Sequence, residues 1–253
     1  MTEAPAGIAA FAAARADVLA RIAAACGRAG RSPEDVTLVA VSKTVDPARL
    51  RDAVAAGLAL LGENRVQEGV AKAAEVPGAR WHLIGPLQSN KARRAVEVYE
   101  TIQSVESVAL AERLDRLARE IRSAGPASRY PVLLQVNVDD DPAKAGLQPD
   151  ELPEALDRLA ALDALDVRGL MTIGRLVEGA EAARPTFVAL RELAVRLRSD
   201  RAAGSTLGPE LSMGMSDDFE VAVEEGATIV RVGRALFGER PHQHGDGPVD
   251  HRH

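Results

Sequence analysis

The chain of 253 residues is long enough to bury one large core, and its composition, 46% hydrophobic and 27% charged, is that of an ordinary globular protein. A net charge of −6 and a pI of about 5.5 argue against a nucleic-acid-binding protein, which usually carries a basic patch. The single cysteine fits a reducing cytoplasm, and neither a membrane helix nor a signal peptide is visible. We therefore expect a cytoplasmic protein that binds neither nucleic acid nor membranes.

Eight short apolar runs follow a leading helical pattern at residues 8–27. They predict strands at 36–42, 58–61, 81–84, 101–105, 131–138, 167–173, 210–213 and 228–232. A helical pattern follows each strand, and the longest of these lie at 107–123 and 178–199. Apolar strands that alternate with helices are typical of a parallel sheet covered on both faces. Eight such units predict a single (β/α)8 TIM-type barrel with an extra N-terminal helix, and a doubly wound sheet is the alternative.

The domain organisation follows from the absence of any internal linker or change in composition. We expect residues 1–240 to form one barrel domain. Residues 241–253 are polar and rich in glycine and histidine, which predicts a disordered tail.

Lys43 lies at the carboxyl end of the first predicted strand, directly after the run Leu38–Ser42. In barrels of this kind, the chemistry takes place at the carboxyl ends of the strands. A lysine there can bind an anion, or it can condense with a carbonyl group. Because the chain has only four lysines among its 31 basic residues, a lysine at this position favours amine chemistry.

The other predicted strand ends carry mainly amide, hydroxyl, imidazole and guanidinium groups, with few carboxylates and no cluster that suggests a metal site. The loops after the last two strands contain Ser212, Gly233 and Arg234, which suit the phosphate site that such loops often form. Ser216 precedes two aspartates and is interpreted as a helix cap. A phosphate site beside a strand-end lysine predicts a phosphorylated carbonyl ligand, bound either by a Schiff-base aldolase or by a barrel that holds pyridoxal 5′-phosphate (PLP). Arginine and asparagine as neighbours of the lysine favour PLP.

Several longer motifs carry a resemblance to a known family. They are Val41–Thr44, Gly62–Glu68, Trp81–Lys91, Gln135–Asn137, Gly169–Met171, Leu211–Phe219 and Val230–Gly233. Together they resemble the pyridoxal phosphate homeostasis protein family over about residues 8–240. The resemblance implies a barrel similar to the N-terminal domain of fold-type III PLP enzymes such as alanine racemase.

The resemblance also implies roles for individual residues. Lys43 would hold PLP covalently as a Schiff base, and Arg231 would face the pyridine nitrogen. The remaining implied cofactor contacts are Ser212, Gly233 and Arg234 at the phosphate, Asn64 near the ring, and His82 and Met213 in the pocket. The position of Arg234 is often a threonine in this family, so the phosphate contact there can come from the backbone N–H alone.

These residues favour a carrier over an enzyme. An arginine cannot accept a proton, so an Arg231 partner would leave the pyridine nitrogen unprotonated and the ring a weak electron sink. Racemases of this kind need a second acid or base, supplied in alanine racemase-like proteins by a tyrosine from an added domain of the partner subunit. The two tyrosines here, Tyr99 and Tyr130, are not predicted at the strand ends, and 253 residues leave no room for such a domain.

We therefore expect a PLP carrier without catalytic residues that stores, buffers or transfers PLP. PLP-dependent apo-enzymes are its expected recipients, and a monomer is its expected state. The alternative is an amino-acid racemase-like enzyme that uses water or His82 as the second base.

Overall fold

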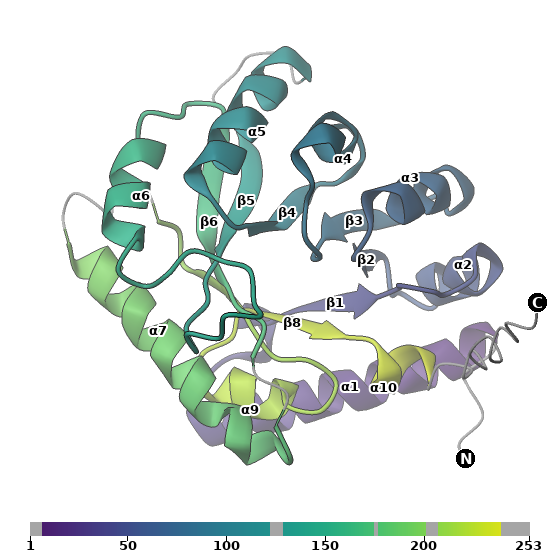
Figure 1. Ribbon diagram of the computed structural model, residues 1–253. Helices are drawn as coiled ribbons and strands as arrows, with labels where there is room; N and C mark the ends of the chain where they lie inside the picture. Colours follow the sequence, from purple (N-terminus) through teal and green to yellow (C-terminus); the bar gives the residue numbers. More distant parts are fainter. Residues whose placement is uncertain (1–6, 122–128, 175–176, 201–206, 239–253) are drawn as a thin grey trace, which may run out of the picture.

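Eight parallel strands form a closed barrel in the computed structural model, which describes residues 7–121, 129–174, 177–200 and 207–238 (Figure 1). The strands are β1 (Thr37–Val41), β2 (Leu60–Glu63), β3 (Arg80–Leu83), β4 (Thr101–Val105), β5 (Tyr130–Gln135), β6 (Leu165–Met171), β7 (Glu210–Ser212) and β8 (Ile229–Val232). They follow one another in chain order, and β8 pairs with β1. The predicted fold class is confirmed.

The helices lie outside the barrel (Figure 1). They are α1 (Ile8–Ala29), α2 (Pro47–Ala55), α3 (Val66–Glu75), α4 (Ala92–Val98), α5 (Val108–Ile121), α6 (Leu152–Leu159), α7 (Arg184–Ser199), α9 (Phe219–Glu224) and α10 (Arg234–Phe237). Short 3-10 helices are η1 (Pro33–Asp35), η2 (Ser89–Lys91) and η4 (Ala180–Ala183). Among the described residues, no helix is long and apolar enough to span a membrane. The tail predicted at 241–253 lies outside the described residues.

The side chains inside the barrel can be identified from a small apolar cluster. Val39, Leu133, Met171 and Ile229 pack together although they come from four different strands, β1, β5, β6 and β8. Such contacts are possible only across the barrel interior. Residues paired in register with members of this cluster face the same way, which places Arg231 (paired with Val39) and Ser212 (paired with Met171) inside as well.

Strand β2 lies two residues later than predicted, at Leu60–Glu63 instead of 58–61. Gly62 pairs with His82 of β3 and with Val41 of β1, so tertiary pairing overrides the low strand preference of glycine. A Cβ atom at Gly62 would lie 2.8 Å from the Val39 side chain. Glycine at this position therefore leaves room for the side chains of Val39 and Ile84.

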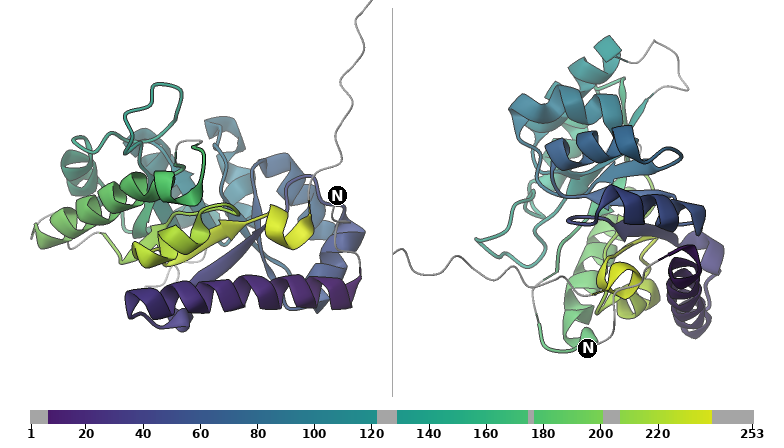
Figure 2. Two further views of the ribbon diagram at one scale, coloured as in Figure 1. Left: turned by 90° about the horizontal axis from the view of Figure 1, so that it is seen from below. Right: turned by 90° about the vertical axis from the view of Figure 1, so that its right-hand side faces the viewer.

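Helix α1 completes the outer layer next to β1 and β8. Figures 1 and 2 show it alongside α9 and α10, and it contacts both of them and α2. In a (β/α)8 barrel this place normally belongs to the helix after β8, but α10 has only four residues. Phe11 of α1 packs edge-to-face on Phe237 of α10, with ring centroids 5.7 Å apart.

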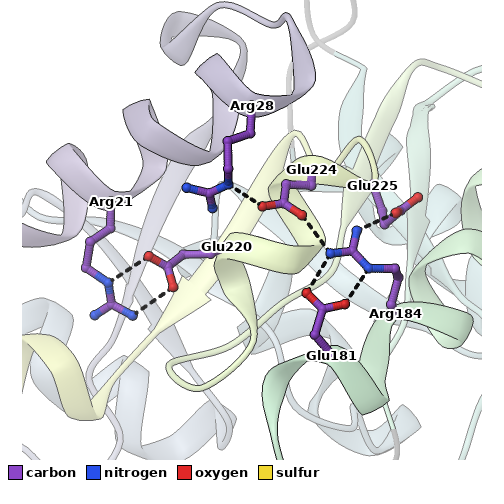
Figure 3. A network of polar contacts seen from close by, with 7 residues as sticks. All are labelled: Arg21, Arg28, Glu181, Arg184, Glu220, Glu224 and Glu225. Carbon is purple, nitrogen blue, oxygen red and sulfur yellow. Dashed lines mark hydrogen bonds and ion pairs between the residues drawn. The ribbon is translucent and has the colours of Figure 1, made fainter.

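Two separate groups of charged side chains link α1 to its neighbours (Figure 3). Arg21 pairs with Glu220 of α9, and a network of Arg28, Glu181, Arg184, Glu224 and Glu225 joins α1, α9, η4 and α7. The Arg28–Glu224 pair, at 2.6 Å, meets the Arg184–Glu224 pair at the same carboxylate. The two pairs that α1 itself makes are partly exposed and each contribute little to stability, so the attachment of α1 depends mainly on its buried apolar face.

We predict that Phe11→Ala lowers the free energy of unfolding by about 3–5 kcal/mol, because Phe11 is fully buried and its removal leaves a cavity between α1 and α10. Urea denaturation measures the effect. Ile8→Ala is the control: Ile8 is 51% exposed on the same helix, and its change should stay within about 0.5 kcal/mol. Equal effects of the two substitutions would show that α1 does not anchor on α10.

Candidate functional site

The predicted site residues lie on an unbroken arc of five neighbouring strands. Seen in the order β3, β2, β1, β8, β7, the carboxyl ends of these strands form one side of what we call the barrel mouth. The residues on this arc are His82 in β3, Asn64 after β2, Lys43 after β1, Arg231 in β8 with Gly233 and Arg234 after it, and Ser212 in β7 with Met213 after it. The closed barrel thus brings together residues from both ends of the chain.

A hydrogen-bonded chain crosses the barrel interior just below the mouth. Arg231 donates from Nη1 to Ser212 Oγ at 2.6 Å and from Nη2 to the Thr172 carbonyl at 2.8 Å. Ser212 Oγ donates in turn to Gln103 Oε1 at 2.6 Å, and Gln103 Nε2 lies 2.8 Å from His82 Nδ1. Since Oε1 of Gln103 accepts, its Nε2 must donate, so Nδ1 of His82 accepts and the ring is neutral.

Burial shifts the pKa values at both ends of this chain. It lowers the pKa of His82 to about 4, and the positive charges of Arg80 and Arg168 act in the same direction. It also lowers the pKa of Arg231 to about 10, against the opposing effect of Asp218. Arg231 therefore stays a cation at neutral pH, although both of its hydrogen-bond partners named above are neutral groups.

The loops after β7 and β8 are joined by Ser216. The backbone N–H of Gly233 donates to Ser216 Oγ at 3.1 Å, and the N–H of Arg231 donates to the Gly214 carbonyl at 3.0 Å. Gly214 has φ +90°, and a Cβ there would lie 2.5 Å from Ala222. Sequence reasoning interpreted Ser216 as a helix cap and missed this contact, because the hydroxyl reaches a strand end far away in the sequence.

Two predicted phosphate or pocket residues point elsewhere. Arg234 forms an exposed ion pair with Asp217, which leaves its backbone, not its guanidinium, at the mouth. Met213 is fully buried in the apolar layer between barrel and helices, so its side chain faces away from the interior. Ser212 remains inside, where its hydroxyl is already engaged by Arg231 and Gln103.

Lys43 lies in a tight turn, and an ionic cluster contacts this turn from outside the barrel. Val45 N–H donates to the Ser42 carbonyl at 3.0 Å, which closes the turn, and Thr44 has φ +64°. The cluster consists of Glu63, Glu68 and Lys72, with Lys72 Nζ 2.7 Å from Glu63 Oε1 and 2.6 Å from Glu68 Oε1. Sequence reasoning missed Glu68 and Lys72, although their spacing of four residues on a helix was a usable signal.

The two carboxylates of the cluster differ in pKa. Burial raises the pKa of Glu63 despite the hydrogen bonds from Lys72 and Ser42. Burial also acts to raise the pKa of Glu68, but the hydrogen bonds from Lys72 and the Thr44 N–H outweigh it, and the net shift is downward. Glu68 is therefore an ionised carboxylate, and it accepts the hydrogen bond from the Thr44 N–H.

We predict a stability loss in acid that depends on His82. Its folded pKa of about 4 lies below the ordinary 6.5, so the folded protein binds fewer protons than the unfolded chain between these values. The stabilisation is complete above pH 6.5 and is lost as pH falls towards 4, by roughly 3 kcal/mol in total. His82→Gln cannot titrate but can still accept from Gln103. Urea denaturation at pH 7 and pH 4.5 should show a smaller loss in the variant, and parallel losses would contradict the assignment.

Comparison with known proteins agrees with the predicted family and fold. Residues 9–241 match the family of the alanine racemase N-terminal domain. The pyridoxal phosphate homeostasis protein of Pseudomonas aeruginosa is 44% identical over 228 residues, which cover 89% of this chain and 94% of that protein.

Solved structures are similar as well. PipY of Synechococcus elongatus PCC7942 with PLP bound has a TM-score of 0.74 at 44% identity, over 87% of this chain and 100% of PipY. Alanine racemase from Corynebacterium glutamicum has a TM-score of 0.67 at 15% identity, over 96% of this chain and 64% of the racemase, and this likeness concerns the fold alone. The chain therefore belongs to the pyridoxal phosphate homeostasis protein family.

Proposed function

We propose that this protein binds PLP at the barrel mouth and holds it covalently through Lys43, for storage, buffering or transfer. One observation carries the proposal. Lys43 directly follows the end of β1, and the adjacent strand β8 carries the buried guanidinium of Arg231. The solved structure of the relative PipY, described as having PLP bound, supports it.

Arg231 suits the pyridine nitrogen of PLP. A guanidinium has five N–H donors and no acceptor, and Ser212 and Thr172 hold this one in a fixed orientation. A donor-only partner matches an unprotonated ring nitrogen, which accepts a hydrogen bond. In this proposal, Asn64 after β2 and His82 in β3 complete the side of the pocket near the ring.

The phosphate fits the loops after β7 and β8. Gly233 and Arg234 lie at the start of α10, and the Gly233 N–H donates to the Ser216 hydroxyl, which joins this loop to the loop after β7. Because the Arg234 side chain pairs with Asp217, we assign the phosphate contact at this position to the backbone. Ser212 contributes by holding Arg231 from below.

The positions of the tyrosines favour a carrier over a racemase. Tyr99 is buried and its hydroxyl donates to the carbonyl of Arg65, while Tyr130 is buried at the start of β5 and donates to the Tyr99 carbonyl. Both hydroxyls are thus buried and already engaged by backbone carbonyls. Bound PLP supplies an electron sink, and an Arg231 partner weakens it by leaving the ring nitrogen unprotonated. We propose that the protein acts as a monomer of one barrel domain, residues 1–240, and passes PLP to apo-enzymes.

We predict that Lys43→Ala abolishes covalent PLP binding, because it removes the amine that forms the Schiff base. The wild-type protein, incubated with PLP and treated with borohydride, should carry a PLP adduct on the peptide that contains Lys43, detected by mass spectrometry. Lys91→Ala, in which a lysine of η2 is removed, is the control and should keep the adduct. An adduct that persists at full yield in Lys43→Ala would overturn the assignment.

We also predict that the PLP-loaded protein does not accelerate exchange of the α-proton of alanine with D₂O beyond the rate of free PLP. The reason is that, in this proposal, the ring nitrogen faces a donor, and both tyrosine hydroxyls are already engaged by backbone carbonyls. Proton NMR of alanine in D₂O measures the rate. Exchange well above the rate of free PLP would favour the racemase-like alternative.

A further inference from the structure

The turn that carries Lys43 is held from outside the barrel by the cluster of Glu68 and Lys72 of α3 and Glu63 of β2. We propose that Glu68, together with Lys72 and Glu63, is a positioning residue for Lys43 that sets how strongly the lysine holds a carbonyl ligand. The inference rests on the proposed function and extends it to residues that do not face the barrel mouth.

Lys72 organises the cluster. Its ammonium lies 2.7 Å from the Ser42 carbonyl, 2.7 Å from Glu63 Oε1 and 2.6 Å from Glu68 Oε1. These three acceptors match the three N–H donors of an ammonium group. The Lys72 side chain is 7% exposed and that of Glu63 is fully buried, so this pair is shielded from water and interacts strongly, whereas the Glu68 side chain is 27% exposed at the edge of the cluster.

Both chain neighbours of Lys43 are held by this cluster. Ser42 accepts from Lys72 through its carbonyl and donates through its hydroxyl to Glu63 Oε1 at 2.7 Å. On the other side, the Thr44 N–H donates to Glu68 Oε1 at 2.8 Å. The backbone of Lys43 is therefore fixed on each side by groups from β2 and α3.

The backbone of Thr44 has a strained conformation that the cluster helps to hold. A φ of +64° is unfavourable for a β-branched residue and persists only where the surroundings impose it. The bond to Glu68 is a charge-assisted contact that stabilises this conformation. Without it, the turn can relax, and the backbone from which the Lys43 side chain extends is no longer held in one place.

A fixed amine matters for a covalent contact more than for the rest of the site. A ligand held by Arg231 and the loops after β7 and β8 presents its carbonyl at one place, and a preorganised amine meets it with little loss of entropy. The residues proposed to hold the ring and phosphate are Asn64 after β2, His82 in β3, and groups on β8 and in the loops after β7 and β8, and none of them belongs to the cluster. Loss of the clamp should therefore weaken the covalent contact selectively.

The chain offers a closely matched control on the far side of the barrel. Asp115 of α5 is a buried carboxylate that accepts from a backbone N–H, that of Ala164, at 2.9 Å and pairs with Arg119, four residues on, at 2.6 Å. Glu68 likewise accepts from a backbone N–H and pairs with Lys72, four residues on. Asp115→Ala thus removes the same kind of contact without touching the Lys43 turn.

The experiment compares two ligands by equilibrium dialysis. PLP can react with Lys43, whereas pyridoxine 5′-phosphate has an alcohol in place of the aldehyde and cannot. We expect Glu68→Ala to weaken PLP binding about tenfold, equivalent to about 1.4 kcal/mol, and to change binding of pyridoxine 5′-phosphate by less than about twofold. Asp115→Ala should change neither affinity by more than about twofold.

Two further variants separate positioning from general stability. Glu68→Gln keeps an oxygen for the Thr44 N–H and should restore most of the PLP affinity. Thr44→Pro removes the N–H and forces φ to about −65°, so it should reproduce the selective loss while Glu68, Glu63 and Lys72 stay in place, even if Glu68→Ala fails to fold.

Three results would overturn the inference. They are equal losses for both ligands, no loss of PLP affinity in Glu68→Ala, or a similar selective loss in Asp115→Ala. Failure of the proposed function looks different: the wild-type protein would then bind PLP no more tightly than pyridoxine 5′-phosphate and form no borohydride adduct, and the inference would fall with it.

Discussion

The pairing of β1 with β8 closes the barrel, and the arrangement at its mouth depends on this closure. Val39 of β1 lies in register with Arg231 of β8, so the strand that ends in Lys43 runs beside the strand that carries the guanidinium. The two residues lie near opposite ends of the chain. Gly62 of β2 continues the same arc and leaves room for the Val39 side chain of β1. A parallel barrel therefore builds the site from distant segments without any long loop.

Two buried cations on either side of the barrel wall have opposite surroundings. Arg231, inside the barrel, donates to a hydroxyl and a carbonyl, both neutral, so its positive charge remains available to a ligand. Lys72, outside the barrel, forms ion pairs with Glu63 and Glu68, so its charge is compensated within the protein. A buried charge is costly unless it is paired. This contrast supports the proposals that Arg231 binds the ligand and that Lys72 supports the turn.

Holding a cofactor and using it require different surroundings for the same lysine. Turnover needs groups that accept and return protons near the ligand. At this mouth the nearest imidazole, His82, is neutral and already accepts from Gln103, and burial holds its pKa at about 4. Arg231 can only donate. The interior chain of hydrogen bonds therefore fixes orientation and offers little proton transfer, which fits the proposed role of a carrier.

The sequence by itself determined the barrel, the order of its strands and the placement of Lys43, because apolar runs bounded by glycine and proline are local signals. It also placed Arg231 and Gly233 at the end of the last strand. Tertiary structure alone decided the register of β2, the contact of Ser216 with Gly233 and the clamp formed by Glu68. Each of these depends on hydrogen bonds between segments that are separated in the sequence. Local residue preferences do not predict which distant backbone group a side chain will contact.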